Sequence, residues 1–391
     1  DMVVLPGIGT VSRFAGVLVI GVSLFAALYL QRIRVHLLNL AMFLFWAWGT
    51  ASYLWSVNPE GTITNIISYF QIMLMMWLIY QWSVRPEQIA GFLAAYVLGC
   101  FVSVGATIYA YLYHIESAYQ RFAAAGFDPN DLAVIISLGI PMAGYLATGK
   151  GHAALLWLWR GYPLLALGVV FLTGSRTGFL VALLGCSYMI WSYRDLSAQS
   201  RLVLPFLGGI AILFLLPHIP VDSLERIHTI GSAVSSGDLN YRTRIWAGAL
   251  EVLGNASCSG LGVIWGTGWD GFPVAVTPYI GEPYVSHNAY LSILVEVGVV
   301  GFTLFALVVA VVLWRVSAMP RRERILWLTL LAMWATGALV LNWEFRKETW
   351  FLFALAVTHA VLLDESDTRE ERPVGAGYVP AAGRNGEAGH G

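Results

Sequence analysis

Eleven stretches of this sequence are long and apolar enough to cross a lipid bilayer as α-helices, which constrains the fold more than any other feature. A spanning helix needs about 20 mostly apolar residues, and only 12% of the 391 residues are charged. None of the stretches alternates apolar and polar residues as the strands of a membrane β-barrel do. We therefore expect an all-α polytopic membrane protein, and the composition excludes a soluble globular enzyme or a nucleic-acid-binding protein. The stretches are residues 14–30, 36–55, 63–82, 88–113, 131–148, 153–172, 177–193, 202–219, 287–314, 325–342 and 348–363.

The positive charges are unequally shared between the two sets of alternating connections. Five connections on one side hold ten Lys and Arg residues, whereas the short connections on the other side hold four. Because Lys and Arg are enriched in cytoplasmic loops, the ten-charge side is expected to be cytoplasmic. The long segment 221–286 then lies outside, and so does the start of the chain. An external start implies one more helix upstream, which would make twelve in the intact protein.

The same reasoning divides the chain into four regions. We expect an N-terminal transmembrane bundle over 1–220, a large external loop over 221–286, C-terminal transmembrane helices over 287–363 and a disordered cytoplasmic tail over 364–391. The stretch 287–314 is too long for one straight crossing, so it either begins outside the bilayer or is kinked.

The external loop contains an amphipathic helix near residues 239–253, with Asp238 or Asn240 as a plausible N-cap. Helical spacing places Arg242 on the same face as the apolar side chains, whereas Arg244 falls on the solvated side. An inward arginine needs an anion, supplied either by a ligand or by a structural carboxylate. The expected buried face is Trp246, Ala249, Leu250 and Leu253, and the expected solvated face is Arg244, Gly248 and Glu251.

Two further external segments carry candidate functional residues. In Thr173-Gly-Ser-Arg-Thr-Gly, Ser175 or Thr177 can cap the next helix, which places Arg176 at a helix N-terminus that favours anions. An arginine that extends to the membrane interface is the plainer alternative. In the segment that starts at Ser286, that serine can cap a helix whose first turn carries His287 and Asn288. A structural histidine is again the plainer alternative.

Other polar residues near the external side are weaker candidates. Glu296 lies within the membrane, where a carboxylate is either functional or paired with an arginine. The segments around Ser52–Glu60 and Asp128–Ala133 have the composition of helix starts and stops.

Five motifs in this order resemble those of the O-antigen ligase family and its relatives, the O-antigen polymerases and protein O-oligosaccharyltransferases. One motif resembles the ligase signature: the pair His287-Asn288 is followed, after nine residues, by Gly298-x-x-Gly301. Two others, Arg176-x3-Leu180 and Arg242-x3-Trp246, resemble the arginine elements of the family. Ser-x-Leu-Trp-Ser at 52–56 and Asp-Pro-Asn-x-Leu-Ala at 128–133 also match. The family has twelve helices and a large periplasmic loop.

The resemblance implies an inner-membrane enzyme that transfers a polysaccharide from undecaprenyl pyrophosphate to a sugar hydroxyl of lipid A–core on the periplasmic face. His287 would be the general base, and Arg176 and Arg242 would stabilise the pyrophosphate leaving group. Glu296 and Glu344 are secondary candidates for the base. We expect no cofactor and no metal, because the external segments contain no Asp-x-Asp, and we expect membrane lipids but no nucleic acid as partners. Residues expected to contact the substrates are Arg121, Tyr241, Arg244 and Asn288.

Other functions remain open at this point. A polymerase or a protein O-oligosaccharyltransferase would use the same lipid-linked donor, and a transporter of lipid-linked sugars belongs to another class. A transporter would place charged or broken helices at mid-membrane and open to the cytoplasmic side, whereas the candidates here lie at the external face.

Overall fold

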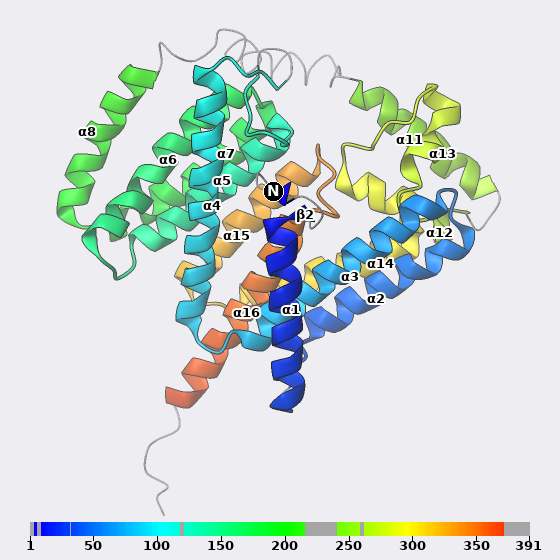
Figure 1. The fold of residues 1–391 in the computed structure, drawn as a ribbon, viewed down its shortest axis with the longest axis horizontal. Coiled ribbons are helices and arrows are strands. Elements are labelled where there is room, and N and C mark those ends of the chain that lie inside the picture. The colour runs from blue at the N-terminus through cyan, green and yellow to red at the C-terminus, as the bar shows by residue number, and fades with distance from the viewer. Residues whose placement is uncertain are drawn as a thin grey trace, which may run out of the picture.

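The structure, a computed structural model, describes residues 4–5, 9–31, 33–117, 121–215, 241–258 and 262–370. Within these ranges the chain is almost entirely helical, and its β-structure is one antiparallel pair of two-residue strands, β1 (Val4–Leu5) and β2 (Gly9–Thr10). The all-α fold class is therefore confirmed (Figure 1).

A helix lies at each of the eleven predicted stretches. Six of the described helices are long and apolar enough to cross a membrane: α2 together with the short helix η1 (Ser52–Trp55), and α3, α4, α5, α6 and α14. That the other five also cross stays a prediction. The eleven are α1 (Val11–Tyr29), α2 (Leu37–Ala51), α3 (Pro59–Trp82), α4 (Pro86–Leu112), α5 (Pro129–Ala147), α6 (Ala153–Thr173), α7 (Arg176–Ser192), α8 (Ala198–Leu215), α14 (Ala289–Ser317), α15 (Arg321–Ala338) and α16 (Lys347–Glu370).

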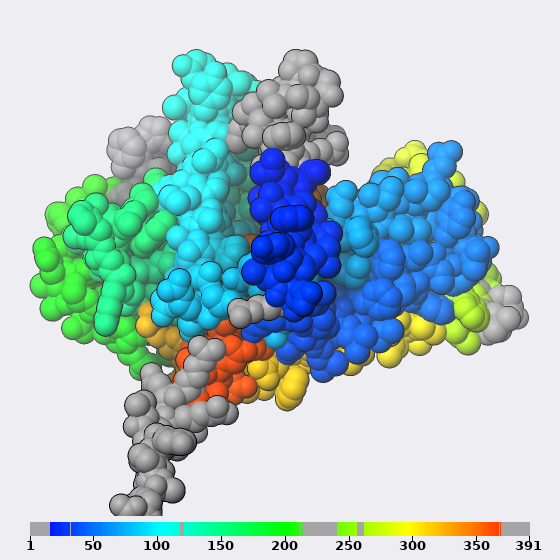
Figure 2. Space-filling model, turned by 60° about the horizontal axis from the view of Figure 1, so that its bottom comes forward, coloured from blue at the N-terminus to red at the C-terminus, as the bar shows by residue number. Residues whose placement is uncertain are grey.

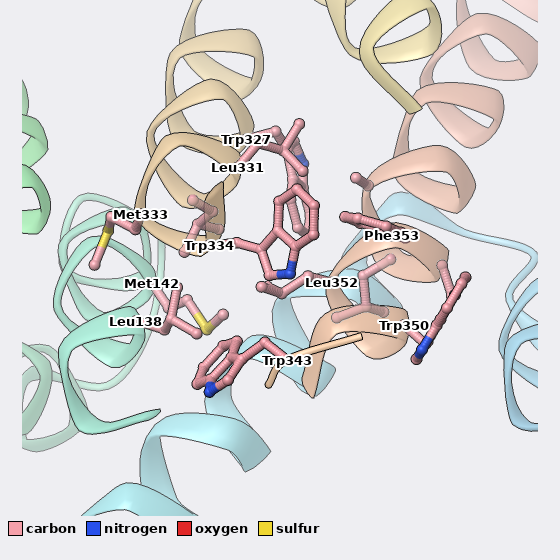
Figure 3. Packing of buried hydrophobic residues seen from close by; sticks show 14 of the residues in the cluster. Leu138, Met142, Trp327, Leu331, Met333, Trp334, Trp343, Trp350, Leu352 and Phe353 are labelled. Atoms are coloured by element: carbon pink, nitrogen blue, oxygen red, sulfur yellow. The ribbon is translucent and has the colours of Figure 1, made fainter. Parts of the chain in front are cut away.

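Helix α5 is the centre of the bundle. Its apolar window is 78% buried, compared with 28–39% for the other five candidate spans, so it is surrounded by protein on most sides. It packs against α4, α6, α7 and α15. Large apolar side chains from α15 and α16 meet Leu138 and Met142 of α5 in the interior, with Trp334 and Phe353 at an edge-to-face angle (Figure 3). By contrast, α1 lies on the surface between α3 and α4 (Figure 2).

Helix α14 is broken at Gly298, which confirms that the long ninth stretch is kinked. Gly298 has φ 66° and ψ −171°, a conformation open to glycine alone. The break frees carbonyl groups that a regular helix would use internally. Thr267 donates its backbone N–H to the Val295 carbonyl at 2.9 Å, and Gly268 donates to Glu296 at 2.8 Å. The kink is therefore the place where the long loop between α8 and α14 is hydrogen-bonded to α14.

The segment from Ser52 to Thr62, around the start of α3, also holds this loop through hydrogen bonds to Trp269 and Asp270. Asn58 caps α3 by accepting the Gly61 N–H at 3.2 Å, as the sequence suggests, but its amide also donates to the Asp270 carbonyl at 3.0 Å. Thr62 donates to the Trp269 carbonyl at 2.7 Å, and Trp269 donates its N–H to Ser52 Oγ at 3.2 Å. This segment is thus both a helix start and an anchor for a turn more than 200 positions away.

The described part of the long loop between α8 and α14 contains three helices, α11 (Arg242–Cys258), α12 (Gly262–Trp265) and α13 (Phe272–Ile280), which gather near one end of α2, α3 and α14 (Figure 1). α11 starts three residues later than predicted, and its N-cap candidates Asp238 and Asn240 lie outside the described residues. Its buried face is partly different from the prediction. Leu250 is exposed and Gly248 is buried, because α13 crosses α11 at Gly248 and brings Ile280 against it.

The end of the chain differs from the prediction in one respect. α16 continues to Glu370, so residues 364–370 are helical rather than part of a disordered tail. The remainder of the predicted tail, 371–391, lies outside the described residues.

Candidate functional site

Arg176 stands at the start of α7, as the sequence predicts. Gly174 ends α6 in a left-handed conformation with φ 57°, and the Ser175 side chain then caps α7 by accepting the Gly178 N–H at 3.1 Å. Arg176 is the first helical residue. The turn therefore places an arginine at the N-terminus of a helix, where the first backbone N–H groups favour anions.

Close packing fixes this turn beside the start of α5. Gly178 lies against Ala133, where a Cβ on residue 178 would overlap the alanine side chain. Ser137 Oγ also donates to the Gly178 carbonyl at 3.2 Å. A glycine is required at this position because the two helices approach each other too closely for a side chain.

Arg121 joins the same two segments. Its Nε donates to the Thr173 carbonyl at 2.7 Å, and its guanidinium donates to Asn130 Oδ1 at 2.7 Å. The sequence suggests a contact with substrate for Arg121, whereas the structure places these donors on protein groups. Its geometry is that of a residue that holds the α6–α7 turn against α5.

Arg242, the first residue of α11, is partly buried between charged neighbours. Burial lowers the pKa of its guanidinium, the negative charge of Asp128 opposes that effect, and the positive charge of Arg176 adds to it. Four residues later, Trp246 donates its Nε1–H to the Ser286 carbonyl at 2.9 Å. Trp246 thus anchors α11 to the turn Ser286–Asn288, the His287 turn. Arg242, one helical turn earlier, lies within the electrostatic range of Asp128 and Arg176.

His287 precedes α14 rather than lying in its first turn. The N-cap is Asn288, whose side chain accepts the Leu291 N–H at 3.0 Å, so the predicted cap at Ser286 is wrong by two residues. His287 itself has a left-handed backbone with φ 47°. Burial lowers the pKa of its imidazole, the charge of Arg242 lowers it further, and Asp128 raises it.

These contacts bring Arg176, Arg242 and His287 together, although they come from three distant segments. Asp128 lies among them and interacts electrostatically with both Arg242 and His287. The sequence predicts Asp128 only as part of a helix start, and it is a helix cap, since it accepts the Asn130 N–H at 2.8 Å. Its second role could not be found from spacing along the chain.

Arg244 and Tyr241 lie at the exposed edge of this region. Arg244 donates to the Tyr241 hydroxyl at 2.8 Å and to the Ile280 carbonyl at 3.1 Å, and its guanidinium lies 5.3 Å from the centre of the Tyr241 ring. Both residues are exposed, which confirms the solvated side predicted for Arg244.

Glu296 and Glu344 are buried near each other behind the His287 turn. Their exposed fractions are 7% and 2%, so neither lies at an open surface. Ser292 donates to Glu296 Oε1 at 3.4 Å, and burial raises the pKa of Glu344, in the α15–α16 loop, to about 7. Asn342 of that loop accepts the His287 N–H at 2.8 Å and donates to Glu344 Oε1 at 3.3 Å.

The α15–α16 loop also contacts the start of α5. Trp343 donates its Nε1–H to Asp131 Oδ1 at 3.0 Å, and Arg346 forms an ion pair with the same carboxylate. Arg346, Asn342 and Trp343 are not among the site residues predicted from the sequence, where Arg346 contributes only to the charge asymmetry. The sequence signal for these residues is the run Asn342-Trp343-Glu344, in which polar residues stand between two apolar stretches.

Within the described ranges, no group of three or more His, Cys, Asp or Glu side chains is arranged to hold a metal ion. The charged groups gathered here are instead two arginines, one histidine and one aspartate. Guanidinium groups bind phosphate oxygens in pairs of parallel hydrogen bonds, so the arrangement is chemically suited to a phosphate or pyrophosphate.

Comparison with known proteins identifies a family whose model covers part of this region. No curated protein matches the chain. A family model described as O-antigen ligase matches residues 162–306, a range that includes Arg176, Arg242, His287 and the kink at Gly298. The match confirms the resemblance to the O-antigen ligase family over residues 162–306.

Proposed function

We propose that this protein is a metal-independent, inverting glycosyltransferase of the membrane type resembling the GT-C class. It would transfer O-antigen polysaccharide from undecaprenyl pyrophosphate to a sugar hydroxyl of lipid A–core. The site would face the periplasm from the inner membrane, as the charge asymmetry of the loops favours.

The observation that carries this proposal is the convergence of Arg176 and Arg242 beside His287. The charge of Arg176 lowers the pKa of Arg242, so the two guanidinium groups together form a positive site that Asp128 offsets only in part. Such a site matches the multiple negative charges of a pyrophosphate. The family match over the same residues supports a lipid-linked donor.

The chemistry follows from the protonation states. A lowered pKa keeps the His287 imidazole neutral at pH 7, which is the form that a general base requires. The acceptor hydroxyl would transfer its proton to His287 as its oxygen forms a bond to the anomeric carbon. The bond from that carbon to the pyrophosphate oxygen breaks, and its electron pair leaves with the pyrophosphate. A single displacement of this kind inverts the anomeric centre.

Arg176 and Arg242 would stabilise the negative charge that grows on the leaving oxygen. Their positions at helix starts, α7 and α11, add the partial positive charge of the helix N-termini. In this role the arginines replace the divalent cation that many sugar-phosphate enzymes use.

The competing function is a polymerase or protein O-oligosaccharyltransferase with the same donor. The proposed test is an assay of purified protein in lipid vesicles, with a lipid-linked glycan as donor and lipid A–core as the sole acceptor. We expect labelled lipid A–core from the wild type, in EDTA as well as in magnesium, and none from His287→Ala.

Glycan extension on the lipid carrier without labelling of lipid A–core would instead identify a polymerase. Transfer to an added protein acceptor alone would identify an oligosaccharyltransferase. Movement of intact lipid-linked sugar across the vesicle membrane without bond cleavage would identify a transporter. A loss of activity in EDTA that magnesium restores would refute the metal-independent mechanism.

A further inference from the structure

The side chain of Asn342 makes three hydrogen bonds around the His287 turn. Its Oδ1 accepts the backbone N–H of His287 at 2.8 Å, and its Nδ2 donates to Ser286 Oγ at 2.7 Å and to Glu344 Oε1 at 3.3 Å. Asn342 lies 55 positions from His287 and belongs to a different pair of helices. The contact is therefore a tertiary restraint on the turn rather than part of the capping of α14.

The His287 turn needs such a restraint. A non-glycine residue with positive φ is uncommon, and its local preferences alone would not keep it there. The cap at Asn288 orders the helix that follows but leaves the peptide group before His287 to other partners. Asn342 supplies the acceptor for that peptide N–H, so it fixes the backbone orientation from which the imidazole extends.

The orientation of the Asn342 amide is itself determined by its partners. A peptide N–H can only donate, so Oδ1 must face His287. The buried carboxyl group of Glu344 offers acceptor oxygens, so the NH₂ group must face Glu344. A rotated amide would place NH₂ against the His287 N–H and oxygen against Glu344, which are two unfavourable contacts.

The loop that carries Asn342 has anchors that do not involve the His287 turn. Trp350 donates its Nε1–H to the Glu344 carbonyl at 2.7 Å, and Thr349 donates to the Trp343 carbonyl at 2.6 Å. Trp343 in turn donates to Asp131 of α5 at 3.0 Å. Asn342 therefore extends from a well-held loop, and its effect on His287 can be separated from the stability of the loop.

We infer that Asn342 is a positioning residue for the transfer reaction, which holds the His287 turn in its left-handed conformation while Glu344 holds the Asn342 amide in the correct orientation. This inference rests on the proposed role of His287 as the base. It assigns no contact between Asn342 and either substrate. Its effect is therefore on turnover and not on the affinity for the lipid-linked donor.

The test compares two changes at Asn342 with a compensating change at Glu344. Asn342→Ala removes all three hydrogen bonds, and Asn342→Asp keeps an acceptor for His287 but sets a second carboxyl group against Glu344. We expect both variants to lose about 10²-fold in turnover, a loss typical of small misplacement of a reacting group. The KM for the lipid-linked donor should stay within about twofold, because no substrate contact is removed.

The double variant Asn342→Asp with Glu344→Gln should recover most of the turnover. The glutamine can donate from its NH₂ group to the new aspartate, which leaves the other aspartate oxygen to accept the His287 N–H. A variant that merely damaged the fold would not be rescued by a second substitution. Recovery in this pair therefore reports on the orientation of the residue-342 side chain.

Trp350→Phe is the matched control, because it removes a hydrogen bond of the same loop without touching the His287 turn. It should lower the melting temperature and leave turnover near the wild-type value. Equal loss of turnover in Trp350→Phe and Asn342→Ala would overturn the inference, since loop stability would then explain both. Wild-type turnover in Asn342→Ala, or no recovery in the double variant, would also overturn it.

The His287→Ala variant distinguishes failure of the inference from failure of the proposed function. If His287→Ala is inactive and Asn342→Ala is fully active, the proposed base stands and the positioning role is wrong. If His287→Ala keeps its activity, the proposed function of His287 is wrong, and the positioning role falls with it.

Discussion

Gly298→Ala is the most demanding test of how α14 is built. With φ 66° and ψ −171°, Gly298 occupies a region in which an alanine costs about 1–3 kcal/mol. A Cβ would also lie 2.5 Å from the Ile264 carbonyl carbon and 2.7 Å from the Gly266 nitrogen, so the loop backbone must move. The substitution therefore acts on the kink and on the loop together.

The expected cost follows from what that movement breaks. The hydrogen bonds from Thr267 to Val295 and from Gly268 to Glu296 would be lost or lengthened, at about 0.5–1.5 kcal/mol each. With the backbone term, the loss is roughly 2–6 kcal/mol, a large part of the ~5–15 kcal/mol that stabilises an average domain. In a protein of this size it corresponds to a fall of roughly 2–7 °C in melting temperature.

Turnover should fall with stability, because the N-terminal part of α14 carries the His287 turn. A shift of about 1 Å in a reacting group typically costs ~10²-fold. The assay is thermal unfolding of the purified protein in lipid nanodiscs, followed by transfer activity at a temperature where the variant is folded.

The matched control is Gly99→Ala on an exposed face of α4, where a Cβ meets nothing within 4 Å. This change should be neutral or should stabilise the helix by about 0.5–1 kcal/mol. A Gly298→Ala protein that melts and turns over like Gly99→Ala would refute the account of the kink given above.

Three further predictions concern the site and the topology. The acidic limb of kcat/KM against pH should lie below the ordinary histidine value of about 6.5, because burial and Arg242 lower the pKa of His287 and a base is lost only when it becomes protonated. Asp128→Asn should move that limb to still lower pH, since it removes the charge that raises this pKa; a shift to higher pH would contradict the electrostatic arrangement. Arg176→Ala and Arg242→Ala should each weaken binding of the lipid-linked donor by roughly 1.5–3 kcal/mol, whereas Arg244→Ala should be mild, and the reverse order for Arg242 and Arg244 would show that α11 is oriented wrongly. Cysteines introduced at residues 270–280 should react with a membrane-impermeant reagent from outside intact spheroplasts, and those at 318–322 should not; the opposite pattern would invert the proposed topology.

Much of the helical architecture could be predicted because each signal is local. An apolar stretch of about 20 residues defines a spanning helix regardless of its neighbours, and a helix lies at every predicted stretch. The kink of α14 was also foreseeable from the length of its apolar run and from Gly298. Ser175 as the cap of α7 is a local signal of the same kind.

The errors occur where tertiary packing decides the outcome. On α11, residue-type preferences put Gly248 in solvent and Leu250 in the core, but α13 needs the space that only a glycine leaves. At the start of α14, both Ser286 and Asn288 are good caps; Asn288 caps the helix, while Ser286 Oγ accepts a hydrogen bond from Asn342 of a distant loop. Local preference could not choose between them.

The candidate site shows the same division. Motif spacing predicts Arg176, Arg242 and His287 individually, but their convergence depends on contacts between segments far apart in the sequence. Arg121 fixes the Arg176 turn to α5, Trp246 fixes α11 to the His287 turn, and Asn342 fixes that turn to the α15–α16 loop.

The electrostatics of the site also explain why the fold must be rigid there. Two guanidinium groups near one another repel, and Asp128 compensates for only one of the two positive charges. A flexible site would relax by moving the arginines apart into water. Here each arginine begins a helix that is held by other groups: Ser175 caps α7, and Trp246 joins α11 to the Ser286 carbonyl. A pyrophosphate would remove that repulsion on binding, and the positive charge would still be in place when further negative charge develops on the leaving oxygen.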